Sequence, residues 1–257
     1  MVVATFNVNS VRARVPNLLS WLESATPDVV VLQETKVEDV KFPFAELEPS
    51  GYTIEIHGQP RYNGVAVLSR LPIDEIDYGF DDEDMPEDCR LLRATIGGVQ
   101  IIDTYVPNGN EVDSEKWEYK MSWLERFALY VRETCDMGSP AVWLGDVNIA
   151  PTSDDVFEPE GKLGDVGHHP DEFSRLQRIV DLGWTDCFRK FTSGPGHYTF
   201  WDFRIPNSVK RNLGWRIDHI FASPALVSKC KRCWVDREPR CKEKPSDHTP
   251  VLAEFDV

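Results

Sequence analysis

The chain of 257 residues is 41% hydrophobic and 11% aromatic, a composition that is typical of a folded globular protein and excludes a disordered one. No apolar run approaches the roughly 20 residues that span a bilayer, and the segment MVVATFNVNS lacks the basic region and cleavage site of a secretory leader, so we expect a cytoplasmic protein without a membrane partner. The formal net charge of −15 argues at first against a polyanionic ligand.

Short runs rich in β-branched residues predict strands. They fall, in chain order, at residues 2–8, 28–34, 64–70, 99–106, 141–148, 215–222 and 250–257. We expect a helix over 12–25, with Pro16 tolerated near its first turn. A second helix, 114–135, has Ser114 as its N-cap and one apolar stripe, and a third, 171–182, stops at Gly183.

No Gly/Ser-rich linker, low-complexity segment or repeat divides the chain, so we expect a single domain over residues 1–257. The mixture of strands and helices predicts the α/β (α+β) class. Two sheets packed face to face, with helices outside, would bury one face of the apolar strands and cover the other.

Charge is unevenly distributed along the chain. Residues 74–88 are almost purely acidic and are interpreted as a solvated loop that faces away from any anion. Residues 204–244 contain eleven Lys or Arg against four Asp or Glu, interleaved with Trp215 and Trp234. Basic and aromatic side chains together suit a phosphate-rich, base-stacking ligand, although a solvated face above core aromatics explains this composition equally well.

Among the six cysteines, Cys230 and Cys233 have the spacing of a metal or redox motif. A zinc site would need a second pair of ligands, and only Cys241 follows nearby. We therefore interpret this pair as reduced thiols at a strand end.

Polar side chains gather where predicted strands begin or end. They are Asn7, Asn9, Glu34, Tyr105, Asn108, Asp146, Asn148, Asp218, Asp247 and His248. A carboxylate or amide at the end of a buried strand is costly unless it is satisfied. One such residue is usually a cap or turn former, but so many of them favour a convergent functional site.

These residue types indicate a chemistry. Glu34 and the carboxamide of Asn7 offer hard oxygen ligands, which suit Mg²⁺, or Mn²⁺, rather than zinc. No Ser or Cys stands in an obvious nucleophile setting, so we expect water to be the attacking group. Phosphodiester hydrolysis needs an activated water, neutralised phosphoryl oxygens and a stabilised leaving group. Carboxylates, a histidine, a tyrosine, amides and one metal could supply all three.

The chain resembles the exonuclease III family of abasic-site (AP) endonucleases in the segments NVNSVRAR, PDVVVLQETK, YVPNG, WLGDVNIAP, YTFWDFR, GWRIDHIFAS and KPSDHTPV. LQE, GDxN and SDH are shared across the endonuclease/exonuclease/phosphatase superfamily, whereas YTFWDFR followed by GWRID is more specific to its DNA-repair branch. The resemblance implies a DNase I-like four-layer sandwich, in which two mixed β-sheets pack face to face with helices outside.

The resemblance also implies roles for the metal and water ligands. Glu34 would be the principal metal ligand, with Asn7 close by. Asp146 would position or deprotonate the attacking water, and Asn148 would orient that water and the phosphate. Asp247 would contribute to the metal site or protonate the leaving 3′ oxygen through water.

Other positions would bind the substrate. His248, hydrogen-bonded to Asp218 rather than to its neighbour Asp247, would hold the non-bridging oxygen, and Tyr105 would stabilise the same oxyanion. The pocket for a flipped-out abasic sugar would be formed by Phe200, Trp201 and Trp215, each of which could instead be plain core. The phosphate-contacting positions would be Arg90, Asn108 and Lys116.

Two positions depart from the family pattern. Asn9 stands where several relatives carry a metal-proximal aspartate, and Asn108 occupies a site that is glutamine in some bacterial members. Residues 202–214 resemble the loop that probes DNA at the lesion.

The resemblance predicts a monomeric, Mg²⁺-dependent AP endonuclease that acts on double-stranded DNA with abasic or damaged sites. It would cut 5′ to the abasic site, leaving a 3′-hydroxyl and a 5′-deoxyribose phosphate, and would also act as a 3′→5′ exonuclease or trim 3′ ends. Two alternatives stay open: a phosphatase or non-specific nuclease of the superfamily, and a catalytically lapsed member that binds nucleic acid as a regulator.

Overall fold

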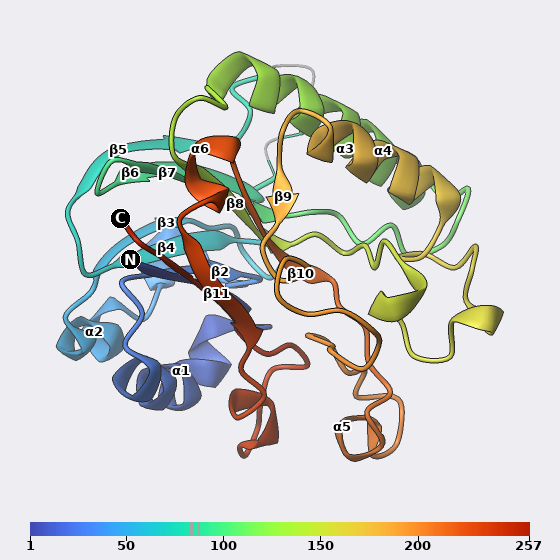
Figure 1. The fold of residues 1–257 in the computed structure, drawn as a ribbon. Helices are drawn as coiled ribbons and strands as arrows, with labels where there is room; N and C mark the ends of the chain where they lie inside the picture. The colour runs from blue at the N-terminus through green and yellow to red at the C-terminus, as the bar shows by residue number, and fades with distance from the viewer. Residues whose placement is uncertain (83–84, 87) are drawn as a thin grey trace.

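The computed structural model describes residues 1–82, 85–86 and 88–257 and stacks two six-stranded sheets between outer helices (Figure 1). Sheet A has the strand order β11-β12-β1-β2-β4-β3. Its strands are β1 (Val2–Asn7), β2 (Val29–Gln33), β3 (Thr53–His57), β4 (Val65–Ser69), β11 (Cys230–Val235) and β12 (Val251–Phe255).

Sheet B has the order β5-β6-β7-β8-β10-β9. Its strands are β5 (Ile73–Tyr78), β6 (Leu91–Ile96), β7 (Val99–Tyr105), β8 (Ala141–Asp146), β9 (Thr185–Asp186) and β10 (Asp218–Ala222). The sheets are mixed, because β1 pairs with β2 and β7 pairs with β8 in parallel, while the other described ladders are antiparallel.

Helices cover the outer faces of both sheets (Figure 1). Helices α1 (Val11–Ala25) and α2 (Phe44–Leu47) lie over sheet A, and α3 (Glu115–Thr134) and α4 (Pro170–Val180) lie over sheet B. The single-turn helices α5 (Ser208–Arg211) and α6 (Pro224–Val227) lie in connecting segments. The 3₁₀ turns are Asp39–Lys41, Glu48–Ser50, Ser153–Asp155, Pro159–Gly161 and Pro239–Cys241. The predicted four-layer sandwich of two mixed sheets is thus observed.

The alternation of side chains along each strand separates the core layers. On β2, Val29 and Val31 pack into the core between the sheets, whereas Val30 and Leu32 pack against α1. A third apolar layer lies between sheet B and the helices α3 and α4. Since both faces of the central strands are buried, these strands consist of nearly continuous apolar runs.

The three predicted helices are present with small differences at their ends. Ser114 caps α3, because its Oγ accepts a hydrogen bond from the Trp117 backbone N–H at 3.2 Å. Pro16 lies in the second turn of α1 rather than in its first. Helix α4 ends at Val180, and Gly183 follows with φ of 128°.

Several predicted boundaries were wrong. The strand predicted over 215–222 begins only at Asp218, and β3, β5, β6, β9 and β11 were not predicted. The acidic segment 74–88 was predicted to be a loop, but its first part is strand β5; residues 83, 84 and 87 of this segment lie outside the described residues.

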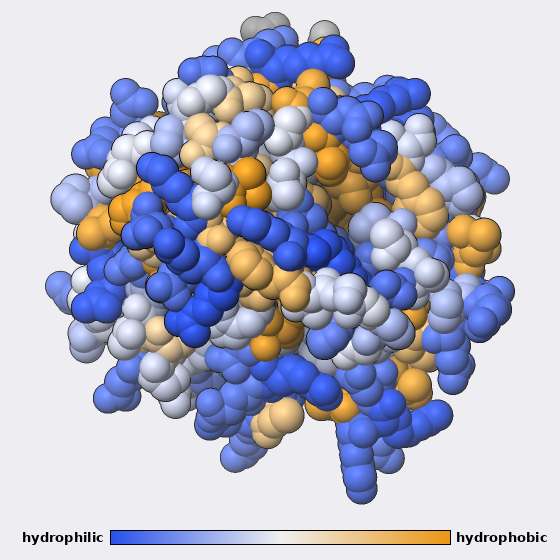
Figure 2. Space-filling view, in the orientation of Figure 1, coloured by the Kyte–Doolittle hydropathy of each residue, from blue (hydrophilic) through white to orange (hydrophobic). Residues whose placement is uncertain are grey.

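Two further properties concern the molecule as a whole. None of the six cysteines forms a disulfide within the described residues, and Cys230 and Cys233 are buried on β11. No helix within residues 1–82, 85–86 and 88–257 is long and apolar enough to cross a membrane. Figure 2 shows one face of the molecule, on which hydrophilic side chains dominate and apolar ones form small separate patches.

Candidate active site

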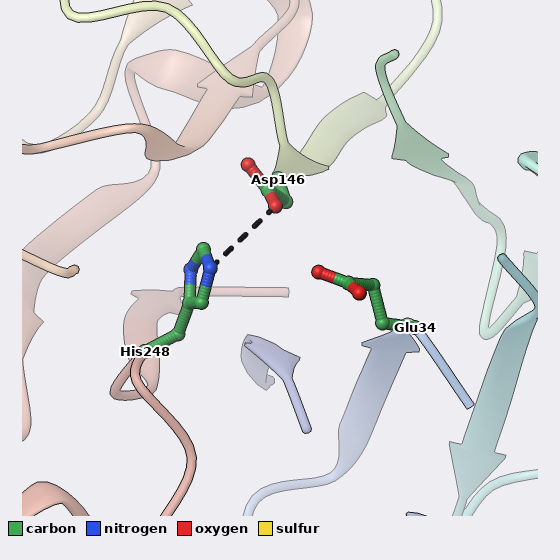
Figure 3. Close-up of side chains that lie close together, drawn as sticks. All are labelled: Glu34, Asp146 and His248. Atoms are coloured by element: carbon green, nitrogen blue, oxygen red, sulfur yellow. Dashed lines mark ion pairs between the residues drawn. The ribbon is translucent and has the colours of Figure 1, made fainter. Parts of the chain in front are cut away.

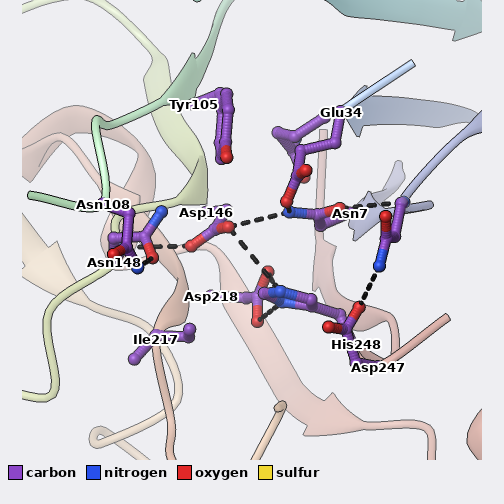
Figure 4. Close-up of polar contacts among 12 residues, drawn as sticks. Asn7, Glu34, Tyr105, Asn108, Asp146, Asn148, Ile217, Asp218, Asp247 and His248 are labelled. Atoms are coloured by element: carbon purple, nitrogen blue, oxygen red, sulfur yellow. Dashed lines mark hydrogen bonds and ion pairs between the residues drawn. The ribbon is translucent and has the colours of Figure 1, made fainter. Parts of the chain in front are cut away.

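Strand pairing brings the predicted polar residues to one end of the sandwich (Figure 4). Because β7 and β8 are parallel, their carboxyl ends meet, and Tyr105 is in register with Asp146. Strand β10 is antiparallel to β8, so its first residue, Asp218, also lies opposite Asp146. In sheet A, Asn7 ends β1 and Glu34 follows the parallel strand β2. The site therefore receives side chains from both sheets.

Three of these residues form a candidate metal centre (Figure 3). Ligand atoms of Glu34, Asp146 and His248 all lie within 4.8 Å of one another. The amide of Asn7 donates to Glu34 Oε1 and to Asp146 Oδ2, both at 2.8 Å. The two carboxylates offer the oxygen ligands that hard divalent cations prefer, and the Asn7 amide holds both of them in place, so Glu34 and Asp146 fit such an ion.

Glu34 and Asn148 both have backbone φ values in the left-handed region, 52° and 53°. This conformation is uncommon for residues other than glycine and often occurs at functional sites. Glu34 directly follows β2, and Asn148 is the second residue after β8.

His248 contacts one carboxylate on each side. Its Nδ1 lies 2.9 Å from Asp218 Oδ2, and its Nε2 lies 3.8 Å from Asp146 Oδ2. Burial alone would lower the pKa of His248, but Asp218 and Asp146 raise that pKa to about 10. Burial raises the pKa of Asp146, and His248 opposes this effect. The carboxylate that is hydrogen-bonded to the ring is thus that of Asp218, and not that of the adjacent Asp247.

Asp247 belongs to a second polar chain at the edge of the site. Its Oδ1 accepts from Asn9 Nδ2 at 2.9 Å, and Asn9 Oδ1 accepts from Lys36 Nζ at 2.6 Å. Lys36 Nζ also lies 2.6 Å from Glu34 Oε2. An aspartate at position 9 would place a second carboxylate beside that of Asp247, whereas the Asn9 amide donates to Asp247 and accepts from Lys36.

The side chain of Tyr105 points toward the carboxylates of Asp146 and Glu34 (Figure 4). Burial, reinforced by Glu34 and Asp146, raises the pKa of Tyr105 well above its usual value, so its hydroxyl is a neutral hydrogen-bond donor. The guanidinium of Arg90 lies 4.6 Å from the centre of the Tyr105 ring and donates to the Tyr105 carbonyl at 3.1 Å.

Asn108 and Asn148 contact each other. Asn108 Nδ2 donates to Asn148 Oδ1 at 3.0 Å, and the backbone N–H of Asn148 donates to Asp146 Oδ1 at 3.0 Å. Lys116, by contrast, is an exposed residue in the first turn of α3.

A cavity of about 350 Å³ adjoins these asparagines. Phe200 and Trp215 line it together with Gly167 and Ile217. Trp201 was predicted to line the same pocket, but it is fully buried and does not line this cavity. Its indole N–H donates to Asn212 Oδ1 at 3.3 Å and its backbone N–H donates to the Asp247 carbonyl at 2.9 Å, so it supports the loop that carries Asp247.

Sequence reasoning missed Lys120 and Glu172, which are buried directly behind the two asparagines. The available signal was weak. Lys120 lies three residues after Trp117 and four before Leu124, in phase with the apolar stripe of α3. Glu172 lies three residues after His169, and the two form the capping box of α4.

The fold and the site define a phosphoesterase-like two-sheet protein with a candidate site for a divalent metal. The model of the Endonuclease/Exonuclease/phosphatase family matches residues 4–248, and the chain belongs to this family.

Similar proteins place it in the exonuclease III branch. The chain is 32% identical to exodeoxyribonuclease III of Haemophilus influenzae, over 98% of both chains. It is 42% identical to an AP endonuclease from Archaeoglobus fulgidus, whose structure covers 100% of both chains with a TM-score of 0.94. It is 39% identical to a 3′ phosphatase from Neisseria bound to a product DNA hairpin, again over 100% of both chains with a TM-score of 0.94. The predicted family and the DNase I-like fold are confirmed.

Proposed function

We propose that this protein is a DNA-repair nuclease that hydrolyses the phosphodiester 5′ to abasic sites in duplex DNA. It leaves a 3′-hydroxyl and a 5′-deoxyribose phosphate, and it also trims 3′ ends or acts as a 3′→5′ exonuclease. One observation carries this proposal: the cluster of Glu34, Asp146 and His248 lies at the same end of the sandwich as a cavity lined by Phe200 and Trp215.

The cofactor in this proposal is Mg²⁺, which Mn²⁺ can replace. Glu34 would hold it, with Asn7 and Asp247 close by; the Asn7 amide donates to Asp146 and the Asn9 amide donates to Asp247. A bound Mg²⁺ neutralises phosphoryl oxygens and helps to orient water.

Protein side chains perform the remaining steps, and Asp247 protonates the leaving 3′ oxygen through water. Asp146 orients the attacking water and accepts its proton, a role that suits a carboxylate whose pKa is raised toward neutrality. His248, held by Asp218, donates through Nε2 to a non-bridging phosphate oxygen. The neutral hydroxyl of Tyr105 donates to the same oxygen as charge grows on it.

The substrate is held on both sides of this centre. Asn148 and Asn108 contact the scissile phosphate, and Arg90 and Lys116 contact phosphates of the DNA backbone. The cavity beside Trp215 receives the sugar that has lost its base, since a missing base lowers the cost of extrusion.

A second candidate is a 3′-end phosphatase or exonuclease that does not cut at internal abasic sites. The likeness to the Neisseria 3′ phosphatase favours it, and the site chemistry would be the same. The two candidates differ in whether the cavity receives an abasic sugar.

One assay distinguishes the candidates. Two labelled duplexes, one with a single internal abasic site and one with a 3′-phosphate end, are incubated with the protein in Mg²⁺ or in EDTA. We expect Mg²⁺-dependent incision 5′ to the abasic site. Removal of the 3′ phosphate without incision would favour the second candidate, and inactivity on both duplexes would favour a catalytically lapsed member.

Three predictions from the sequence stay predictions: that residues 1–257 form one domain, that the protein is a monomer, and that it is cytoplasmic.

A further inference from the structure

Lys120 and Glu172 form an ion pair whose side chains are both 0% exposed. The ammonium of Lys120 also donates to the backbone carbonyl of Asn108 at 3.1 Å and to that of Asn148 at 2.9 Å. An ammonium has three N–H donors, so all three are used. Two of them hold the backbone of residues whose side chains contact each other in the site.

Glu172 makes the matching contacts on the other side. It accepts from the backbone N–H of Gly167 and from that of His169, both at 3.0 Å. Gly167 in turn accepts from the Ala150 N–H at 2.7 Å. The carboxylate thus joins the loop that precedes α4 to the segment that follows Asn148.

The ion pair therefore connects three segments that are far apart in the chain: the turn after β7, the turn after β8 and the loop before α4. Asn108, Asn148 and Gly167, one from each segment, line the 350 Å³ cavity. Lys120 and Glu172 do not line this cavity; they lie behind it and act on it only through the backbone.

The cost of burial argues for a positional function. Burial lowers the pKa of Lys120, and Glu172 opposes this effect. A well-packed apolar pair often stabilises a fold as well as a buried ion pair does. An apolar pair would not, however, hold carbonyl and N–H groups of three segments in a defined direction.

We propose that Lys120 and Glu172 are positioning residues for the nuclease reaction. Lys120 holds Asn108 and Asn148 in register with Asp146, and Glu172 holds the Gly167 side of the cavity. This inference rests on the proposed function and adds to it two residues that do not touch the substrate.

The first test uses Lys120→Met and the double variant Lys120→Met/Glu172→Leu. The double variant leaves no unpaired buried charge, so its stability should recover relative to the single variant. We expect kcat on the abasic duplex to fall by on the order of 10²-fold in both variants, with KM changed by less than about threefold because most of the DNA affinity comes from phosphate contacts outside Asn108 and Asn148. A double variant with recovered thermal stability and wild-type kcat would overturn the proposal.

Phe127→Leu is the matched control. Phe127 is fully buried on the same helix but packs against Trp123 and Trp143. The Phe127→Leu substitution should lower the melting temperature, while kcat per folded molecule stays at the wild-type value. If Lys120→Met behaves in the same way as this control, its role is merely structural.

Glu172→Gln tests the cavity side. It replaces one acceptor oxygen with a donor, so one backbone N–H of the loop before α4 loses its partner. We expect a larger loss on the abasic duplex than on the duplex with a 3′ phosphate, because only the first substrate needs the cavity. Equal losses on both would contradict the role assigned to Glu172.

Amide hydrogen exchange separates this inference from the proposed function, since it needs no substrate. In Lys120→Met, but not in Phe127→Leu, exchange should become faster in residues 106–112, 147–152 and 164–172. If the wild-type protein cuts neither duplex, the proposed function fails, and faster exchange in these segments still supports positioning. Unchanged exchange in all three segments overturns the positioning role.

Discussion

His248 has two different neighbours, and this asymmetry determines what its removal should do. Asp218 holds Nδ1, which leaves Nε2 directed toward Asp146 and, in the proposed mechanism, able to donate to a substrate phosphate. We predict that His248→Ala lowers the single-turnover rate on the abasic duplex by on the order of 10²–10⁴-fold. DNA affinity, measured by fluorescence anisotropy in EDTA, should stay within a few-fold of wild type, because most affinity comes from phosphate contacts elsewhere.

His197→Ala provides the matched control for this measurement. His197 is an exposed histidine whose ring packs beside Phe188, and its replacement should leave the rate unchanged. A His248→Ala protein with the wild-type rate would remove His248 from the mechanism.

Asp103 is a buried carboxyl group between the two sheets. It is 0% exposed and accepts one hydrogen bond, from Gln33 Nε2 at 2.7 Å. Burial raises the pKa of Asp103 well above its ordinary value of 3.8. Between these two pKa values the folded protein binds one more proton than the unfolded chain, so the free energy of unfolding falls as pH rises, by at most about 1.4 kcal/mol per pH unit.

We therefore predict that Asp103→Asn becomes more stable relative to wild type as pH rises from 4 toward 8. Urea unfolding of both proteins at three pH values measures this difference. Asp74→Asn, an exposed position on β5, is the control and should show little change. If the difference between Asp103→Asn and wild type is independent of pH, the carboxyl group is ionised in the folded state.

At the scale of elements, strand polarity explains why the site could be predicted. Tyr105, Asp146 and Asp218 come from parallel and antiparallel neighbours whose pairing places them at one edge. Strongly apolar strands such as β2 and β8 are recognisable locally, and polar residues at their ends stand out. Most of the central architecture was accessible in this way, whereas the family was indicated by the resemblance of motifs such as YTFWDFR and GWRIDHIFAS.

The elements that were missed have weaker local patterns. Four of the six residues of β5 are exposed, and two charged residues lie between the cysteines of β11. Their strand conformation depends on pairing with β6 and β12, which a local pattern does not contain. Residues 215–217 are extended but make only isolated bridges, such as Trp215 with Phe200, so the prediction of a longer β10 was wrong.

Side-chain burial was the other limit of prediction. Trp201 and Trp215 occur in the same aromatic, basic region, yet only Trp215 lines the cavity. Lys120 lies in phase with the apolar stripe of α3, but the local pattern does not contain Glu172 of α4, against which it is buried. Such distinctions depend on contacts between elements that are distant in the chain.

The cavity itself gives a prediction at this scale. Trp215→Ala should lower kcat/KM on the abasic duplex by about tenfold, equivalent to about 1.4 kcal/mol of lost apolar contact. Removal of a 3′ phosphate should be nearly unaffected, because that reaction does not need the cavity. Phe191→Ala, which removes an exposed aromatic ring outside the cavity, is the control. Equal effects on both substrates would show that Trp215 acts only in folding.

At the scale of the whole molecule, the candidate metal centre lies between the two sheets. Glu34 directly follows β2 of sheet A, and Asp146 is the last residue of β8 in sheet B. The Asn7 amide donates to both carboxylates and so links them. An ion bound there would connect the two halves of the sandwich. Because such a site does not exist in the unfolded chain, the free energy of binding adds to the free energy of unfolding.

We predict that Mg²⁺ raises the melting temperature progressively, roughly with the logarithm of its concentration above its Kd, and that the free energy of unfolding gains about 2.7 kcal/mol at about 100 times the Kd. Glu34→Gln should lose most of this gain. The net charge of −15 offers another explanation, since any cation screens repulsion between acidic groups. Screening would stabilise wild type, Glu34→Gln and Asp74→Asn equally, and NaCl at matched ionic strength would reproduce it. Specific binding requires that Asp74→Asn keeps the Mg²⁺ effect, that Glu34→Gln loses it, and that NaCl does not replace it; equal stabilisation of all three proteins would rule out a metal site at Glu34.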